Sequence, residues 1–154
     1  MVVRVDENGI GSLPPPAPPG NHPVDVGLRS EAIILAELTK RGYSVLMPFG
    51  VNHRYDFVLD MGDRFLRVQC KTGRLRNGGV TFSTESIRSN TKQVLRRGYA
   101  GEVDWFLVYC PETEQVYAVP IEAASGCAVT LRIARPENNQ SKRIRWAADH
   151  ALPA

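Results

Sequence analysis

The chain has 154 residues, of which 43% are hydrophobic and 23% charged, and its formal net charge is +3 at pH 7. These values fit one soluble domain with one core, and the mild positive charge permits an anionic partner such as nucleic acid without demanding one. No apolar run approaches the ~20 residues that cross a bilayer, and the N-terminus lacks a stretch of signal-peptide type, so we expect no membrane contact.

The three cysteines, Cys70, Cys110 and Cys127, are widely spaced and form no CxxC motif. An odd number at such spacings predicts neither a disulfide framework nor a zinc site, and it favours a reducing cytoplasm. We expect each thiol to be a small buried apolar group rather than a nucleophile.

Residues 1–22 contain the stretch LPPPAPPGNH. Proline fixes φ and lacks an N–H group, so this segment is expected to be an extended, flexible arm. A partner-binding arm is the less favoured alternative. The folded domain is then expected to span residues 23–154.

A helix is predicted from Asp25 to Arg41. Apolar residues recur there at helical spacings on one face: Val24, Leu28, Leu35 and Leu38. Gly42 follows as a C-terminal stop. Glu31 interrupts the apolar stripe, and a carboxylate on a core-facing side needs a partner. Glu31 therefore either faces inward toward such a partner or lies at the margin of the stripe and reaches solvent.

Two strands are predicted within residues 54–73, which read RYDFVLDMGDRFLRVQCKTG. Gly62 and Asp63 match the signature of a two-residue type II′ turn. If these two residues form the turn, Met61 pairs with Arg64.

Counting back from this turn pairs Leu59 with Leu66 and Asp56 with Gln69. Lys71 lies two residues beyond Gln69 and so shares its face. A slip of one residue would separate these side chains, so the prediction depends on the turn.

Further strands are predicted at 43–48, 78–84, 104–110, 115–120 and 128–134. A short helix is predicted from Ile87 to Arg97, and another near the C-terminus through Ile144, Trp146 and Ala147. This order of helix, strands and small helices indicates an α/β domain with a mixed sheet.

The carboxylates of Glu31 and Asp56 and the amide oxygen of Gln69 are hard ligands that suit Mg²⁺. A metal held there can activate water against a phosphodiester, and Lys71 can orient that water or stabilise the phosphate. Acyl transfer is disfavoured because no Ser or Cys has a base placed beside it. The alternative is structural: Asp56 begins a surface strand, and Gln69 and Lys71 are its exposed partners.

The chain resembles PD-(D/E)XK nucleases, in the branch of group I intron-encoded homing endonucleases. The motif residues stand in SEAIILAEL (Glu31), GVNHRYD (Asp56) and RVQCKTG (Gln69, Lys71). The stretches RGYSVLMP, GYAGEVDWFLVYCPET, VYAVP and NNQSKRIRWA extend the resemblance over residues 27–146. Gln69 replaces the commoner acid, and Tyr55 stands where proline is usual.

This resemblance implies a restriction endonuclease-like core, with a central mixed β-sheet flanked by helices. It implies catalytic roles for Glu31, Asp56, Gln69 and Lys71. It also implies a Mg²⁺ site, with Mn²⁺ as a substitute, formed by Asp56, Gln69, Glu31 and the backbone carbonyl of Cys70.

The implied activity is hydrolysis of DNA by a site-specific homing endonuclease, working as a homodimer or homotetramer. A Holliday-junction resolvase is the nearest alternative, and a non-catalytic DNA-binding module is the alternative from another class.

Basic residues follow the motif closely: Arg74, Arg76, Arg88 and Lys92. A nuclease needs such residues for phosphate contacts beside its site. A solvated helix face and loop explains them equally well.

Overall fold

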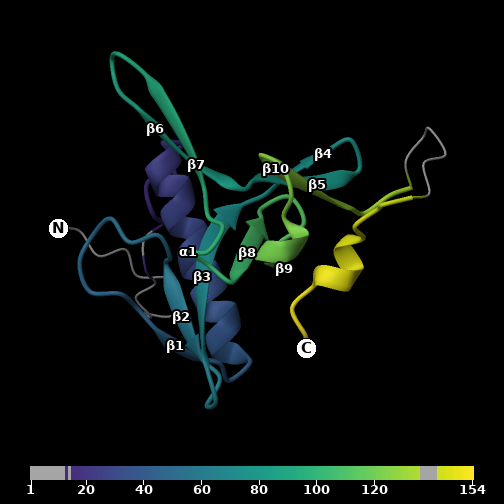
Figure 1. The fold of residues 1–154 in the computed structure, drawn as a ribbon. Helices are drawn as coiled ribbons and strands as arrows, with labels where there is room; N and C mark the ends of the chain where they lie inside the picture. The colour runs from purple at the N-terminus through teal and green to yellow at the C-terminus, as the bar shows by residue number, and fades with distance from the viewer. Residues whose placement is uncertain (1–12, 14, 136–141) are drawn as a thin grey trace, which may run out of the picture.

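The computed structural model describes residues 13, 15–135 and 142–154. One α-helix, α1 (Pro23–Lys40), lies against one face of a five-stranded sheet, as Figure 1 shows. Most of the predicted N-terminal arm lies outside the described residues, and its described part is exposed and forms no helix or strand before Pro23. Among the described residues, no helix is long and apolar enough to span a membrane.

The strands are β1 (Ser44–Leu46), β2 (Phe57–Asp60), β3 (Phe65–Thr72), β4 (Arg74–Arg76), β5 (Gly79–Ser83), β6 (Glu85–Ser89), β7 (Val94–Gly98), β8 (Trp105–Cys110), β9 (Gln115–Pro120) and β10 (Ala128–Arg132). The five-stranded sheet has the order β1-β2-β3-β8-β9. Strands β3 and β8 are parallel and the other neighbours are antiparallel. The predicted α/β class with a mixed sheet is therefore confirmed.

The register predicted for the β2–β3 hairpin is the one observed. Leu59 pairs with Leu66, and the Met61 N–H donates to the Arg64 carbonyl over 2.9 Å. Gly62 has φ +87°, a conformation that suits glycine at the first central position of a type II′ turn.

Helix α1 buries Ser30, Ile34 and Leu38 against the sheet. The predicted apolar stripe is wrong in the first turns, because Val24 is 69% exposed and Leu28 is 64% exposed. These turns border an open hollow rather than packed strands. The helix begins after His22, whose Nδ1 accepts a hydrogen bond from the Val24 N–H.

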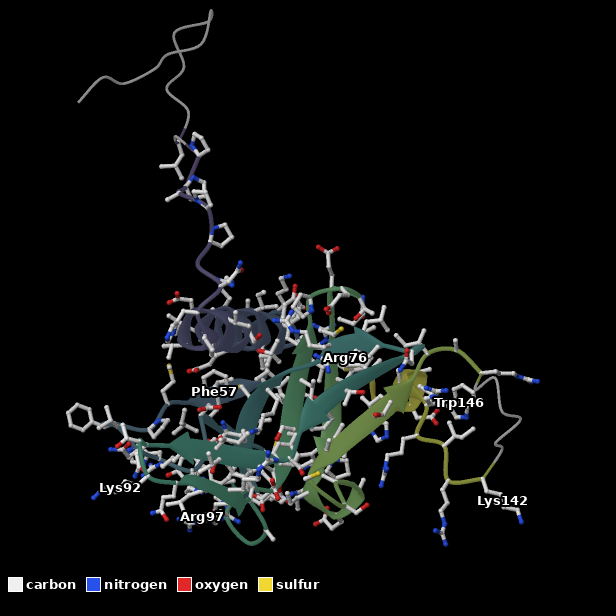
Figure 2. The ribbon with its side chains drawn as sticks, turned by 90° about the horizontal axis from the view of Figure 1, so that it is seen from above. Phe57, Arg76, Lys92, Arg97, Lys142 and Trp146 are labelled. Carbon is white, nitrogen blue, oxygen red and sulfur yellow. The ribbon has the colours of Figure 1, made fainter. Side chains whose placement is uncertain are left out.

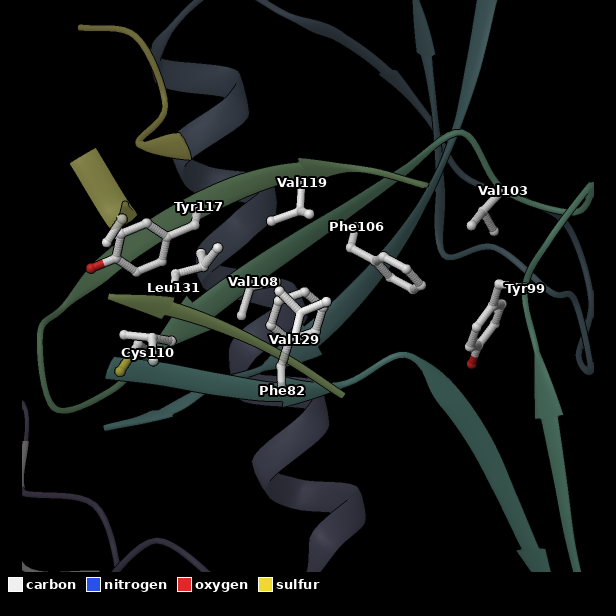
Figure 3. Packing of buried hydrophobic residues seen from close by; sticks show 12 residues of the cluster. Phe82, Tyr99, Val103, Phe106, Val108, Cys110, Tyr117, Val119, Val129 and Leu131 are labelled. Atoms are coloured by element: carbon white, nitrogen blue, oxygen red, sulfur yellow. The ribbon is translucent and has the colours of Figure 1, made fainter. Parts of the chain in front are cut away.

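The other face of the large sheet is covered by a three-stranded sheet of order β10-β5-β4 rather than by a helix. Figure 3 shows the core between them, where Phe82 and Phe106 pack edge-to-face. Gly73 joins β3 to β4, and a Cβ there would lie 2.6 Å from Val80 Cγ1. The close approach of the two sheets therefore requires glycine at this position.

The helix predicted from Ile87 to Arg97 is wrong, because this segment forms the antiparallel ribbon β6–β7. At its tip, Asn90 Oδ1 accepts the N–H groups of Lys92 and Gln93, each over 2.9 Å. These bonds favour a turn over a continuing helix.

The C-terminal helix is shorter than predicted. It is a 3₁₀ turn from Ala147 to His150 that begins after Ile144 and Trp146. Trp146 instead forms an isolated β-bridge to Arg132, the last residue of β10, so the Trp146 backbone is extended rather than helical. Cys110 is buried as expected, but Cys127 is exposed, so the expectation of burial is wrong for that thiol.

Candidate active site

The candidate site forms where β2 ends beside β3. The Asp56 N–H donates to the Val68 carbonyl over 2.8 Å, as the last backbone bond of this pairing. Two positions further along β3, where β2 no longer pairs, the Cys70 N–H donates to Asp56 Oδ2 over 2.7 Å. The Asp56 carboxylate thus replaces the missing strand, which explains why a charged group lies at this edge.

Gln69 contacts Asp56, as predicted, although the paired strand residues end one position earlier, at Phe57 and Val68. Its Nε2 donates to Asp56 Oδ2 over 2.7 Å. Asp56 Oδ1 and Gln69 Oε1 make no hydrogen bond within the described part of the chain. Two oxygens of the pair are therefore available to a ligand.

Glu31 reaches the same place from α1. It is half-buried and lies in an open hollow of about 310 Å³. The hollow is lined by Val24, Gly27, Leu28, Glu31, Asp56, Gln69 and Cys70. Glu31 and Asp56 therefore line the same hollow, which agrees with the inward placement that the sequence left open.

The two carboxylates share an unfavourable environment. Burial raises the pKa of Glu31, and the nearby charge of Asp56 raises it further. Burial also raises the pKa of Asp56, although the Cys70 N–H, Lys71 and Gln69 act in the opposite direction. Two desolvated anions that face one hollow are the arrangement that a bound cation would stabilise.

The donor set fits a hard divalent cation. Glu31, Asp56 and Gln69 supply carboxylate and amide oxygens, and the Cys70 carbonyl lies beside them, where it accepts a hydrogen bond from Gln69 Nε2 over 3.4 Å. Burial raises the pKa of the Cys70 thiol well above its ordinary value, so its sulfur remains protonated and is a poor ligand. The described residues contain no group of three or more His, Cys, Asp or Glu side chains that could hold a metal, so neutral oxygens must complete this set.

Lys71 lies on the side of the site nearest the ribbon. Its Nζ donates to the Glu85 carbonyl over 3.0 Å and lies 4.6 Å from the ring centroid of Tyr99. Burial lowers the pKa of Lys71 to about 8, against the opposing effect of Asp56. Lys71 does not line the hollow itself, but it and Asp56 each shift the pKa of the other.

Arg54 and Tyr99 belong to the site, and sequence reasoning missed both. The Arg54 guanidinium lies 4.1 Å from the centroid of the Tyr99 ring, and its Nε donates to Glu102 over 2.6 Å. It also donates to Ser86 Oγ over 2.8 Å. These contacts fix the aromatic ring beside Lys71. The only available signal was the position of Arg54, two residues before Asp56.

Ser30 was also missed. It is a buried polar residue, and its Oγ lies 2.6 Å from Thr72 Oγ1. This contact joins α1 to the end of β3 and so fixes the helix position next to Glu31. The only available signal was the position of Ser30 directly before the candidate glutamate Glu31.

The four basic residues predicted to contact DNA do not form one cluster. Arg74 lies on β4, 3.8 Å from Glu112, and Arg76 is exposed at the end of the same strand. Arg88 is on β6 and Lys92 in the turn of the ribbon, and both are exposed. Figure 2 shows Arg76 and Lys92 at separate parts of the molecule.

A family model described as PD-(D/E)XK endonuclease matches residues 22–153. The chain belongs to the PD-(D/E)XK endonuclease family. It is therefore an endonuclease, and the resemblance and the restriction endonuclease-like fold predicted from the sequence are confirmed.

Two solved structures are similar to this endonuclease. The structure of a bacterial homing endonuclease, I-Ssp6803I, has 23% sequence identity and a TM-score of 0.68, with 86% of this chain and 89% of that chain covered. The Holliday junction resolvase Hjc of Archaeoglobus fulgidus, an archaeal hyperthermophile, has 16% identity and a TM-score of 0.40, with 69% and 83% covered. The search of the curated proteins found no match.

Proposed function

We propose that this endonuclease is a metal-dependent enzyme that cuts DNA at specific sites, as a homing endonuclease does. One observation supports the proposal most strongly. The open edge of β3 brings Asp56, Gln69 and the Cys70 carbonyl together, and Glu31 meets them from α1. This set of oxygens beside a half-buried lysine suits hydrolysis of a phosphodiester.

Glu31, Asp56, Gln69 and the Cys70 carbonyl would hold Mg²⁺, with Mn²⁺ as a substitute. When bound, the ion supplies Lewis-acid stabilisation of the charge that develops on the phosphate and lowers the pKa of the attacking water. The Asp56 carboxylate is fixed for this role by the Cys70 N–H and the Gln69 amide, so its free Oδ1 keeps a constant orientation.

Lys71 would act on the attacking water or on a phosphate oxygen. Because its pKa is lowered to about 8, it can hold or release a proton close to neutral pH. The water oxygen forms a bond to phosphorus, the bond to the leaving sugar oxygen breaks, and that oxygen takes up a proton. The products are a phosphate monoester and a free hydroxyl.

One site cuts one strand, so a double-strand cut calls for two copies of the chain. We infer a homodimer or homotetramer, because twofold symmetry matches the two strands of a duplex. Light scattering of the protein with and without duplex DNA would measure this state.

Cleavage of a DNA panel tests the proposed substrate. Supercoiled plasmid carrying an inserted random library, a four-way junction, and single strands should be incubated with the protein in Mg²⁺ and in chelator. Cuts at a recurrent duplex sequence, in Mg²⁺ only, are expected. Cleavage of the junction alone would replace the proposal with a resolvase, and binding without cleavage would replace it with a non-catalytic module.

A further inference from the structure

The β6–β7 ribbon extends away from the folded body, as Figure 1 shows at its upper left. Its two strands pair only with each other, and every residue of β7 is exposed. None of the described side chains of β6 and β7 belongs to the buried core. An isolated two-stranded ribbon is marginally stable in water, so its retention is not explained by packing.

The ribbon exposes aliphatic side chains that a solvated surface does not need. Ile87 is 55% exposed, Val94 61% and Leu95 53%. Ile87 is paired with Arg96, and Leu95 with Arg88, so each face combines an aliphatic group with a cation. Each face of the projecting ribbon can therefore offer an apolar contact beside a positive charge.

The charge of the ribbon favours a polyanionic partner. Residues 85–98 contain four cationic residues and one acid, a net charge of +3, which equals the formal net charge of the whole chain. Arg96 lies 3.8 Å from Glu85 and Arg97 contacts Glu102, whereas Arg88 and Lys92 form no salt bridge within the described residues. Two unpaired cations are therefore available near the projecting end.

We propose that the β6–β7 ribbon enters the major groove of duplex DNA, with its cations on the phosphates and its aliphatic side chains against the base edges. The major groove of B-DNA admits a two-stranded ribbon, and thymine methyl groups there accept apolar contacts. Single-strand binding uses stacked aromatic side chains, and residues 85–98 contain none. A duplex is therefore the favoured occupant over a single strand.

The base of the ribbon lies at the candidate site. The Glu85 carbonyl accepts a hydrogen bond from the Lys71 ammonium group, and Ser86 Oγ accepts one from the Arg54 guanidinium. A duplex held by the ribbon would thus be held beside the groups proposed to cut it. This inference rests on the proposed function and names the element that reads the duplex.

The test compares two duplexes of the same sequence, one unmodified and one in which glucosylated 5-hydroxymethylcytosine fills the major groove. Binding is measured by fluorescence anisotropy in chelator. The parent should bind the filled duplex about 10-fold or more weakly, and the double variant Arg88→Ala/Lys92→Ala should bind both duplexes weakly and with a flatter salt dependence. Arg64→Ala, an exposed cation at the β2–β3 turn, is the matched control and should bind as the parent.

Leu95→Ser provides a second readout, because it should reduce the preference for the unmodified duplex while the salt dependence remains. Three results would each overturn the inference. The parent binds both duplexes equally, it binds single strands more tightly than duplex, or the double variant binds as the parent does. A plasmid cleavage assay distinguishes failure of the ribbon assignment from failure of the proposed function. If the parent cuts no DNA but the ribbon variants still lose groove-dependent binding, the proposed function fails and the ribbon assignment stands.

Discussion

Gln69→Glu should make the fold depend on the metal. The Gln69 amide donates to Asp56 Oδ2 over 2.7 Å, and the substitution places a second carboxylate at this contact. Two unit charges at that separation repel by about 6 kcal/mol at an effective dielectric constant of 20. Sharing a proton or moving apart relieves most of this repulsion, so we expect the free energy of unfolding in chelator to fall by about 1–3 kcal/mol.

Mg²⁺ should reverse this loss, because the added carboxylate becomes a charged ligand in place of a neutral one. A ligand at 100 times its dissociation constant stabilises the folded state by about 2.7 kcal/mol. In a domain of this size, each kcal/mol raises the melting temperature by roughly 2–4 °C. Thermal melts in chelator and in saturating Mg²⁺ measure both effects. Gln115→Glu, at the exposed start of β9, is the matched control and should melt as the parent in both conditions.

The reasoning would be refuted by either of two results. One is a Gln69→Glu variant that melts with the parent in chelator, which would mean that the carboxylates do not meet. The other is a Mg²⁺-induced rise in melting temperature no larger than that of the parent, which would mean that a negative charge at residue 69 does not strengthen metal binding.

Three further outcomes are expected. Lys71→Met should lower the cleavage rate by ~10²-fold or more. At pH 7 it should leave the protein as stable as the parent or more stable, because the folded pKa of Lys71, about 8, lies below its ordinary value. This gain in melting temperature should shrink as pH rises from about 8 toward 10. Glu31→Gln should weaken Mg²⁺ binding in calorimetry, and in chelator at neutral pH the variant should be as stable as the parent or more stable. Since burial raises the pKa of Glu31, that gain in stability should vanish below about pH 4, where the carboxylate is protonated in both the folded and the unfolded protein. Alanine substitutions test the four cations expected to contact phosphates: Arg74, Arg76, Arg88 and Lys92. Each should reduce the slope of log affinity against log salt concentration by about one unit, and four unchanged slopes would assign these residues to a solvated surface.

The sequence predicted the core of the site because one local signal fixed its geometry. The Gly62-Asp63 turn determines the β2–β3 register up to the Phe57–Val68 pair, and Gln69 contacts the Asp56 side chain one residue beyond that pair. Glu31 could be placed on the inner half of a helix, but its orientation required the tertiary packing that Ser30 provides through Thr72.

Other parts of the site had no local signal. Arg54 lies in a loop, and it reaches Tyr99 only because the chain between them folds back through the ribbon. The ribbon itself was predicted as a helix, because its aliphatic residues are few and exposed and so show no clear period of two. Elements that are not packed on a core lack the burial pattern from which strands are usually recognised.

Single-turnover cleavage of plasmid DNA by Asp56→Asn tests the central claim most directly. Asparagine keeps an oxygen that can accept the Cys70 N–H, but it removes the anion proposed to hold the metal. At saturating DNA and Mg²⁺, the rate should fall by ~10²-fold or more, as expected when charge stabilisation at the reacting phosphate is lost. The melting temperature should stay close to that of the parent, and Asp63→Asn, in the exposed turn, should cut at the parental rate. A parental rate for Asp56→Asn would contradict the assignment of this site as the hydrolytic centre.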